Sequence, residues 1–212
     1  MIKLHHNPLS SNSRKVTILC ELLGVPIESD VVDLTKPEDR KRLAAINPNN
    51  KVPVLEDGDF VLWESTAIMQ WLCDKTPGGD LFYPTELRAR TEVNRWLAWG
   101  LAHWSAAIGG ITFERLWKKL VTGQDADPAQ IARHEQFFHQ FARVLDGHLA
   151  ERQFLVGSTL TIGDVAIATS LDHAKAAKLP LEPYANILAW LERLQALPAW
   201  KKTAPPRLER AA

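Results

Sequence analysis

The chain has 212 residues, with 25 Lys and Arg against 25 Asp and Glu, so its formal net charge is zero when the histidines are neutral. Its hydrophobic fraction of 46% and charged fraction of 24% are ordinary for a folded globular protein and exclude an intrinsically disordered chain. Because affinity for nucleic acids comes largely from Lys and Arg that neutralise phosphates, the balanced charge also argues against a nucleic-acid-binding protein.

The cysteines and the apolar stretches indicate the compartment. Cys20 and Cys73 each lie in a helix-like run, so we expect them to be reduced and buried in a reducing compartment. The first six residues lack the apolar stretch of a secretory signal. Residues 96–113 carry no formal charge and approach the length of a membrane-spanning helix. Their polar residues favour instead a buried helix that ends at Gly109 and Gly110, and we expect a cytoplasmic protein without membrane association.

Strands and helices alternate at the start of the chain. Ile2 and Leu4 alternate with polar neighbours, which predicts a short strand, and a polar loop follows over residues 7–13. Apolar residues then recur at helical spacing over residues 16–23, and Gly24 suits the end of that helix. The next expected elements are a strand over residues 27–32 and a helix from Pro37 to Ile46, stopped by Asn47-Pro48.

A β-hairpin is the clearest local signal. Residues 52–56 and 59–63 are two apolar-rich runs, and Asp57-Gly58 between them predicts a two-residue turn. Glu64-Ser65 follows at once, and a further helix begins there. The order β-α-β-α-β-β-α requires a parallel pair with a crossover and an antiparallel hairpin, so we expect a small mixed sheet flanked by helices.

The rest of the chain predicts helices only. A long helix carries Val93 and its apolar neighbours, another begins at Asp127-Pro128, and a late one covers residues 187–194. Thr161 and Asp164 have the spacing of a capping box, which we interpret as a folding device. The expected organisation is an N-terminal domain over residues 1–78, a linker over residues 79–86 and an all-helical domain over residues 87–212.

Several kinds of catalytic site are excluded by their missing motifs. The chain has no glycine-rich nucleotide-binding loop. His134 and His139 are five residues apart, whereas a helical zinc site needs two histidines four apart. Two cysteines are too few for a structural zinc site, and neither lies in the loop after the first strand. We therefore expect no nucleotide site, no metal and no catalytic disulfide.

Two segments combine polar side chains with the start of a helix. Residues 10–13 are four residues of helix-capping type, more than one cap requires. A hydroxyl and backbone N–H groups at a helix N-terminus also stabilise an anion. Glu64-Ser65 is a second such place. From the residues alone, capping and anion binding both remain open for these segments.

Together these segments resemble the cytosolic glutathione transferases, of the serine-type theta- and delta-like members or of the nu-like bacterial members. The matching segments are Pro8-Leu9-Ser10-Ser11-Asn12-Ser13-Arg14, Asn47-Pro48-Asn49-Asn50-Lys51-Val52-Pro53-Val54-Leu55, Leu62-Trp63-Glu64-Ser65-Thr66-Ala67-Ile68 and Gly157-Ser158-Thr159-Leu160-Thr161-Ile162-Gly163-Asp164. The resemblance spans essentially the whole chain. It implies a thioredoxin-like N-terminal domain, an all-helical C-terminal bundle, glutathione as co-substrate and a homodimer.

The resemblance also implies roles for residues of the first domain. Ser10 matches the serine whose hydroxyl donates a hydrogen bond to the glutathione sulfur, with Ser11 beside it among the glutathione-binding residues. Asn12 matches an asparagine that assists or replaces this donor in nu-like members, so the division of labour between Ser10 and Asn12 stays open. Val52-Pro53 matches the segment, with the family's cis-proline, that pairs with the cysteinyl backbone. Glu64-Ser65 matches the pair that holds the γ-glutamyl end.

Two further predictions concern the ends of the two substrates. Asn50 and Lys51 fall where the glycine carboxylate is bound, and Lys51 can supply the positive charge. The electrophile needs an apolar pocket beside the sulfur, for which the candidates are Leu9, Trp99, His103, Ala106, Phe113 and Trp117. For Trp99, Phe113 and Trp117 there are two equal alternatives to a pocket role, which are packing in the core and packing at a dimer contact.

The expected function is that of a glutathione transferase, which ionises the glutathione thiol for attack on a hydrophobic electrophile, as in detoxification. One alternative is glutathione-dependent disulfide reduction of the nu type, favoured by Asn12. Another is a non-catalytic binding protein with the same fold.

Overall fold

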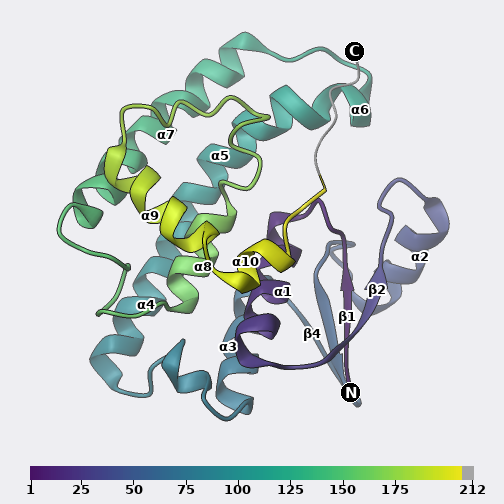
Figure 1. The fold of residues 1–212 in the computed structure, drawn as a ribbon. Coiled ribbons are helices and arrows are strands. Elements are labelled where there is room, and N and C mark those ends of the chain that lie inside the picture. Colours follow the sequence, from purple (N-terminus) through teal and green to yellow (C-terminus); the bar gives the residue numbers. More distant parts are fainter. Residues whose placement is uncertain (207–212) are drawn as a thin grey trace. The chain divides into compact units, whose positions relative to one another are not determined.

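The computed structural model describes residues 1–206, which divide into two compact units. The first unit joins Met1–Thr85 to the segment from Pro198 to the end of the described chain, and the second is Glu86–Leu197 (Figure 1). The predicted division placed every residue after 86 in the helical domain, whereas the structure packs the last described helix with the first unit.

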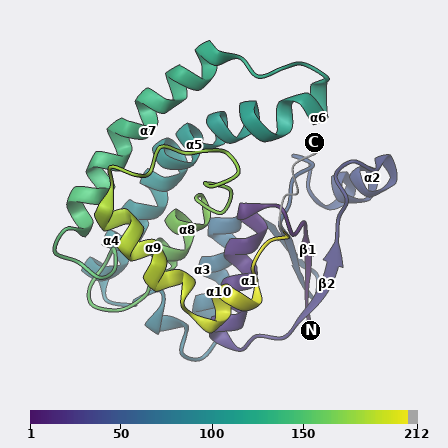
Figure 2. The ribbon, with the colours of Figure 1, turned by 45° about the horizontal axis from the view of Figure 1, so that its top comes forward.

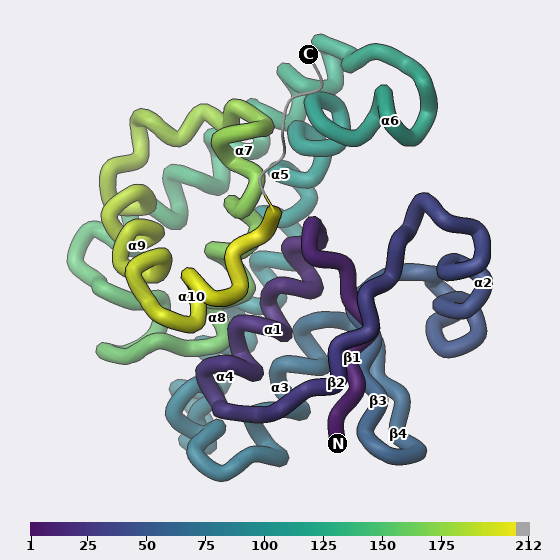
Figure 3. Tube along the Cα trace, turned by 45° about the vertical axis from the view of Figure 1, so that its right-hand side comes forward, coloured from purple at the N-terminus to yellow at the C-terminus, as the bar shows by residue number. Residues whose placement is uncertain are grey.

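The first unit is a four-stranded mixed sheet with helices on both faces. Its elements are β1 (Ile2–His6), α1 (Ser11–Leu23), β2 (Ile27–Val31), α2 (Pro37–Ile46), β3 (Val54–Asp57), β4 (Phe60–Trp63), α3 (Ser65–Lys75), the 3₁₀ turn η1 (Gly79–Leu81) and α10 (Pro198–Lys202). The strand order is β2-β1-β3-β4, with β1 and β2 parallel and the other pairs antiparallel (Figure 3). The predicted β-α-β-α-β-β-α order and the thioredoxin-like fold are confirmed.

The two faces of the sheet carry different side chains. Leu4 of β1 and Leu55 of β3 are paired and fully buried on one face. Helices α1 and α3 pack against each other on this side of the sheet (Figure 1). Side chains alternate along a strand, so Val54 points to the opposite face, where Leu43 of α2 and Val32 join it in a second apolar cluster. Burial on both faces fixes the register of the strands.

The hairpin differs from its prediction by one residue. Asp57 pairs with Phe60, so the two turn residues are Gly58 and Asp59 and not Asp57 and Gly58. Gly58 has φ +67° at the first turn position, where hairpin turns of the Gly-first type require a positive φ. Strand β3 begins at Val54 and not at Val52, because Pro53 has no N–H to donate to a ladder.

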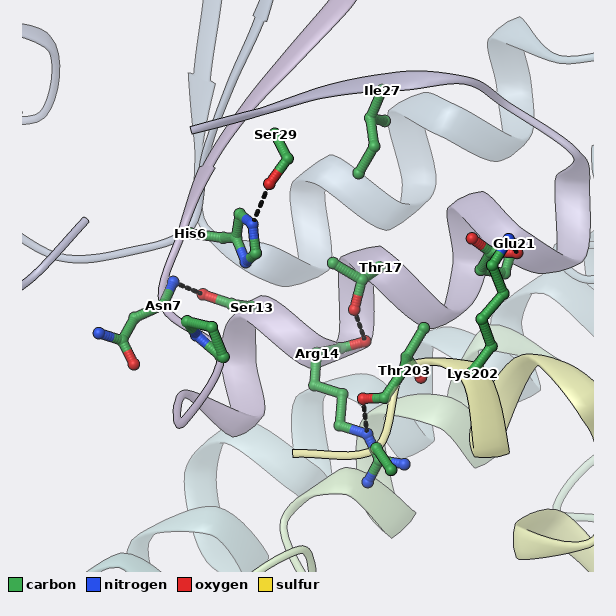
Figure 4. Close-up of a pocket in the computed structure, with 12 residues that line it drawn as sticks. His6, Asn7, Ser13, Arg14, Thr17, Glu21, Ile27, Ser29, Lys202 and Thr203 are labelled. Carbon is green, nitrogen blue, oxygen red and sulfur yellow. Dashed lines mark hydrogen bonds and ion pairs between the residues drawn. The ribbon is translucent and has the colours of Figure 1, made fainter. Parts of the chain in front are cut away.

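Helix α10 is held to α1 by Arg14. The Arg14 guanidinium is buried, and it donates to the carbonyl oxygens of Trp200 (2.9 Å) and Thr203 (3.0 Å). It also lies over the Trp200 ring, and Figure 4 shows the side chain reaching the C-terminal segment. The C-terminal segment is therefore part of the packing around α1.

The second unit consists of helices. They are α4 (Leu87–Trp99), the π-helical turn η2 (Gly100–Trp104), α5 (Ser105–Thr112), the π-helical turn η3 (Phe113–Trp117), α6 (Lys118–Thr122), α7 (Pro128–Leu149), α8 (Ile162–Thr169) and α9 (Ala185–Gln195). Figure 2 shows α7 running beside α5, with which it packs. None of the helices within residues 1–206 has the length and apolarity needed to cross a membrane.

The expected helix end at Gly109-Gly110 is wrong. The helical backbone continues from Leu87 through both glycines to Thr122. Gly110 is instead needed for packing, because a Cβ there would lie 2.4 Å from the His134 ring of α7. A glycine inside a helix can thus mark a close helix crossing as well as a helix end.

The predicted capping box at the start of α8 is confirmed, and its carboxylate accepts further hydrogen bonds from outside the box. The fully buried Asp164 carboxylate accepts a hydrogen bond from the Thr161 N–H (2.9 Å). It also accepts from the Thr161 hydroxyl, the Leu155 N–H and the Trp190 indole N–H. Burial raises the pKa of Asp164 above its usual value, against the opposing effect of these hydrogen bonds. One carboxylate thereby joins α8, α9 and the loop before α8.

We expect Asp164→Ala to lower the free energy of unfolding by at least about 3 kcal/mol, because it leaves several buried donors without an acceptor. Chemical denaturation followed by tryptophan fluorescence measures this loss. Asp125→Ala, which removes an exposed carboxylate paired only with Lys119 in the described chain, is the control and stays within about 0.5 kcal/mol of wild type. Equal stability of the two variants would contradict the role of Asp164.

Candidate functional site

The strand register brings three loop segments to one end of the sheet. His5 near the C-terminal end of β1 pairs with Val54 at the start of β3, and Val54 pairs with Trp63 at the end of β4. The segments that adjoin these residues are the loop before α1, the loop before β3 and the start of α3. Because neighbouring strands are about 5 Å apart, the three segments lie within about 10 Å of one another across the sheet end.

The first segment is shaped by Asn7, which is not among the site residues predicted from the sequence. Its amide nitrogen donates to the Val32 carbonyl (2.9 Å), and its amide oxygen accepts from the Leu9 N–H (2.9 Å). Its carbonyl accepts from the Ser10 N–H (2.9 Å). Asn7 therefore fixes the turn that presents Ser10. An Asn-Pro pair after a strand is a known turn signal and could have identified it.

Ser10 is the N-cap residue of α1, and capping was one of the two roles that its sequence left open, beside anion binding. Its hydroxyl oxygen accepts from the Ser13 N–H (3.2 Å). Within residues 1–206 the hydroxyl proton has no acceptor, and the side chain is half-buried. The hydroxyl can therefore donate to a further group at the positive end of the helix dipole while its oxygen is held. Capping and donation are compatible in this one residue.

Two neighbours on the first turn of α1 differ in exposure. Ser11 is half-buried and Asn12 is exposed. The Asn12 side-chain oxygen accepts a hydrogen bond from the Lys15 ammonium (2.8 Å), and Lys15 is only 2% exposed. Lys15 is not among the site residues predicted from the sequence. A lysine in the polar stretch before the first buried apolar residue of a helix is usually exposed, so its burial had no clear sequence signal.

The second segment is built around Asn47, which is buried. Its amide nitrogen donates to the Lys51 carbonyl (2.7 Å), and its own carbonyl accepts from the Asn50 N–H (2.8 Å). Asn50 has φ +51°, a left-handed conformation that asparagine tolerates better than most residues. The Asn50 side-chain oxygen is buried and has no partner within residues 1–206. The Lys51 side chain is exposed beside it.

Val52 presents backbone groups that the fold leaves unpaired. The Val52–Pro53 peptide bond is cis, and Val52 is 8% exposed. Within residues 1–206 neither the N–H nor the C=O of Val52 makes a hydrogen bond. Buried backbone groups are nearly always paired, so this donor and acceptor are suited to an extended peptide that runs alongside.

The third segment contains a strained residue. Glu64 has φ +75° and ψ +109°, a conformation that side-chain-bearing residues rarely adopt. Its side chain is exposed, and Ser65 is buried as the first residue of α3. Neither side chain makes a hydrogen bond within the part of the chain that the structure describes. Backbone strain of this kind concentrates at functional sites, which supports a binding role for Glu64 and Ser65.

The histidines of β1 are occupied elsewhere. His5 is buried between Asp30 (2.6 Å) and Glu56 on the face of the sheet opposite to Leu4, and Arg42 also pairs with Asp30. Burial raises the pKa of Asp30, but hydrogen bonds from Arg42 and His5 outweigh it and hold the pKa below its usual value. This charged cluster links four elements, β1, β2, α2 and β3, so His5 has a packing role in the sheet.

A separate cavity of about 270 Å³ borders the loop before α1. Figure 4 shows His6 in this cavity, bonded to Ser29 (2.7 Å). Burial is the larger influence on His6 and lowers its pKa, against the raising effect of Asp30. The cavity is lined by His6, Asn7, Pro8, Ser13, Arg14, Thr17, Glu21, Ile27, Ser29, Lys202, Thr203 and Ala204. None of the predicted glutathione-binding residues lines this cavity.

The candidate pocket residues of the second unit fall into different surroundings. Trp99 and His103 both contact Phe141 of α7, with ring centroids 6.1 and 5.0 Å away. Trp117 instead packs edge-on against His173 at 5.7 Å. Ala106 and Phe113 are exposed. Thus Trp99 and His103 belong to one aromatic cluster and Trp117 to another. Leu9 lies in the first unit, and the assignment of all six residues to a substrate pocket stays a prediction.

The histidines that had raised the question of zinc are used in packing and hydrogen bonding. His139 bonds the Tyr184 hydroxyl (2.8 Å), and the His134 ring packs on Gly110. Within residues 1–206 no group of three His, Cys, Asp or Glu side chains is arranged to hold a metal ion. The prediction that the site needs no metal stays a prediction.

The first unit has a thioredoxin-like fold with an open hydroxyl, an unpaired backbone segment and a strained acidic residue at one sheet end. A helical unit follows it in the chain. Comparison with protein families identifies this combination. Residues 4–79 match the glutathione S-transferase N-terminal domain, and residues 128–193 match the glutathione S-transferase C-terminal domain. The chain therefore belongs to the glutathione S-transferase family.

Individual relatives place the chain near the theta and delta classes, as predicted. It is 31% identical to mouse glutathione S-transferase theta-2 over 197 residues, covering 92% of this chain and 81% of the relative. Bovine theta-1 is 31% identical over 202 residues, covering 92% of this chain and 82% of the relative. Among solved structures, a delta-class glutathione transferase of Nilaparvata lugens has 29% identity and a TM-score of 0.82, covering 96% of this chain and 92% of that chain. The structure of human glutathione S-transferase T1-1 has 28% identity and a TM-score of 0.84, and the match covers 96% of this chain and 86% of that chain.

The strain at Glu64 leads to a test of stability. Glycine adopts φ +75° without steric cost, so we expect Glu64→Gly to raise the free energy of unfolding by about 1 kcal/mol, after allowing for the greater entropy of glycine in the unfolded chain. Denaturant titration measures the change. The control Glu38→Gly places glycine in the first turn of α2, where φ is ordinary, and does not stabilise. A Glu64→Gly variant less stable than wild type would show that the Glu64 side chain contributes more than its backbone strain costs.

Proposed function

We propose that this protein ionises the thiol of glutathione and directs the thiolate to attack an apolar electrophile. In this reaction the sulfur forms a bond to the electrophilic atom, and the leaving group departs with the electron pair of the bond that breaks. The observation that carries the proposal is the half-buried Ser10 hydroxyl at the start of α1, which keeps a proton to donate. Membership of the glutathione S-transferase family supports glutathione as the thiol.

The energy needed is within the reach of this arrangement. A free thiol has a pKa near 8.5, so about 3% of it is ionised at pH 7. Lowering that pKa by about two units requires about 2.7 kcal/mol of preferential stabilisation of the thiolate. A hydrogen bond to a charged acceptor contributes about 1.5–3 kcal/mol, and a helix N-terminus adds about 0.3–1 kcal/mol. A donor at Ser10 therefore suffices without a general base.

The remaining segments of the sheet end would hold the rest of the tripeptide. The unpaired N–H and C=O of Val52, next to Pro53, suit the cysteinyl backbone, which has one acceptor and one donor to offer. Glu64 and Ser65 would hold the charged amino and carboxyl groups of the γ-glutamyl end, with Ser11 nearby. At the glycine end, the exposed Lys51 ammonium would complement the carboxylate, and the buried oxygen of Asn50 would accept a hydrogen bond from the glycine N–H.

Ser10→Ala tests the donor. We expect it to raise the pKa of the bound thiol by one to two units and to lower kcat at pH 6.5 by about 10- to 100-fold, while glutathione still binds. Ultraviolet titration of the bound thiol, calorimetry and a conjugation assay with an aryl halide measure the three quantities. Ser158→Ala, in an exposed loop of the second unit, is the control. Unchanged activity in Ser10→Ala would assign the donor elsewhere.

A second candidate function is glutathione-dependent reduction of disulfides. The exposed Asn12 amide favours it, since an amide N–H is a second donor for the sulfur. In that reaction one glutathione thiolate attacks a disulfide, and a second glutathione resolves the mixed disulfide to give oxidised glutathione. Turnover of hydroxyethyl disulfide without aryl-halide conjugation selects this function. A non-catalytic protein would show neither reaction, and for such a protein glutathione affinity measured by calorimetry is the relevant property.

The electrophile would bind in an apolar pocket beside the sulfur. We propose Leu9, Trp99, His103, Ala106, Phe113 and Trp117 as its candidate residues. The cluster of Trp99 and His103 on Phe141 supplies the aromatic surface that such a pocket needs. The variants Trp99→Ala and Trp117→Ala distinguish the two clusters by their effect on the KM for the electrophile.

The first unit also has an apolar surface suited to a second copy of the chain. Phe60 of the edge strand β4 is exposed, and its ring lies 4.8 Å from that of the exposed Trp71 on α3. Exposed aromatic residues grouped at a sheet edge are typical of protein interfaces. We therefore propose a homodimer that covers this surface.

Phe60→Ser tests the dimer. Loss of one aromatic anchor is expected to weaken the dimer at least about tenfold, seen as a higher dissociation constant in light scattering and sedimentation. Leu81→Ser, which removes an exposed apolar side chain of η1, is the matched control and leaves the mass unchanged. A wild-type protein that is monomeric at high concentration would contradict the proposal outright.

A further inference from the structure

Lys15 is a buried cation one helical turn from the proposed thiolate site. Its side chain is 2% exposed, and its ammonium donates to the Asn12 side-chain oxygen at 2.8 Å. Lysine is almost never this buried unless its charge is held by polar partners. The residue is part of the first unit and of the same helix as Ser10 and Asn12.

The position of this charge is unfavourable for the helix itself. Side chains on a helix lean toward its N-terminus, so the Lys15 side chain runs back toward the first turn of α1. The N-terminal end of a helix dipole is positive and disfavours a cation. Burial disfavours the same charge. Both the helix dipole and burial therefore disfavour the Lys15 charge, and the hydrogen bond to the Asn12 oxygen is one contact that offsets this cost.

The hydrogen bond fixes which way the Asn12 amide faces. An ammonium group only donates, so the Asn12 atom that meets Lys15 must be the oxygen. The amide nitrogen then points away from Lys15, and within residues 1–206 it has no acceptor. Without Lys15 the exposed amide would rotate freely and present its oxygen, which repels an anion, as often as its nitrogen.

We propose that Lys15 is a positioning residue that holds the Asn12 amide with its nitrogen outward, as a second hydrogen-bond donor to the ionised glutathione sulfur beside Ser10. The ammonium also polarises the amide to which it is bonded and so strengthens the outward N–H as a donor. The inference rests on the proposed function, because it concerns the same thiolate. Asn12 and Lys15 thus act together to stabilise the thiolate.

Lys15→Met removes the ammonium and keeps an unbranched side chain of similar length, whereas Lys15→Arg keeps a buried donor. We expect Lys15→Met to raise the pKa of the glutathione thiol in the enzyme complex by about one unit, which is about tenfold less thiolate at a fixed pH below that value. We expect kcat to fall in Lys15→Met, with little change in the KM for glutathione. Lys15→Arg is expected to keep most of the wild-type kcat.

Asn12→Ala separates positioning from a general effect of the charge. If Lys15 acts through Asn12, adding Lys15→Met to Asn12→Ala shifts the thiol pKa no further. The other ionisable groups at this end of the unit, His6, Lys51 and Glu64, are unchanged in all variants and so cannot produce the difference. An equal shift in both backgrounds, or no shift in Lys15→Met, would overturn the inference.

Ser10→Ala in the same titration keeps the two proposals apart. If Ser10→Ala raises the pKa of the bound thiol and Lys15→Met does not, only the role of Lys15 is overturned. If Ser10→Ala leaves that pKa unchanged, the proposed donor is overturned. Should Lys15→Met fail to fold, Lys15→Leu is titrated instead. Because leucine has no hydrogen-bond donor for the Asn12 oxygen, we expect Lys15→Leu to lose as much as Lys15→Met, and wild-type behaviour would contradict the role of Lys15.

Discussion

The antiparallel pairing of β3 with both β1 and β4 is the constraint on which the candidate site depends. It places the end of β1, the start of β3 and the end of β4 at the same sheet end, so that residues 10, 52 and 64 meet although up to 54 positions separate them. Burial of Leu4 and Leu55 on one face and of Val54 on the other leaves no alternative register. A slip by one residue would expose this core and would also move each segment of the site.

Asparagine side chains then shape the loops that the strands bring together. Asn7 and Asn47 each use both amide atoms on neighbouring backbone groups, in the place where a strand or helix ladder is absent. The Ser10 hydroxyl proton and the Val52 backbone groups stay unpaired within the described chain, while the loops around them are held by these hydrogen bonds. Pre-organised polar groups of this kind can meet charge on a ligand without first breaking bonds within the protein.

The order of strands and helices could be predicted from the sequence because local signals agree with the final packing. Gly24, Pro37 and Asp127 mark helix ends that the structure has, and Thr161 with Asp164 forms its capping box. The turn at Gly58 was misplaced by one residue, because two adjacent dipeptides both suit a turn. Gly110 and Lys15 could not be understood locally. Gly110 is required by the close approach of the His134 ring on α7. Lys15 is buried by tertiary packing, although the residues before it in the sequence are polar.

The attachment of α10 to α1 through Arg14 makes the first unit discontinuous in the chain. Residues 1–85 contain the whole sheet, yet the carbonyl groups that Arg14 binds belong to residues 200 and 203. During synthesis the helical unit is complete before these partners emerge, so it can fold while the buried guanidinium of the earlier unit still lacks them. Helix α10 therefore completes the packing of the first unit only after the whole second unit has been synthesised.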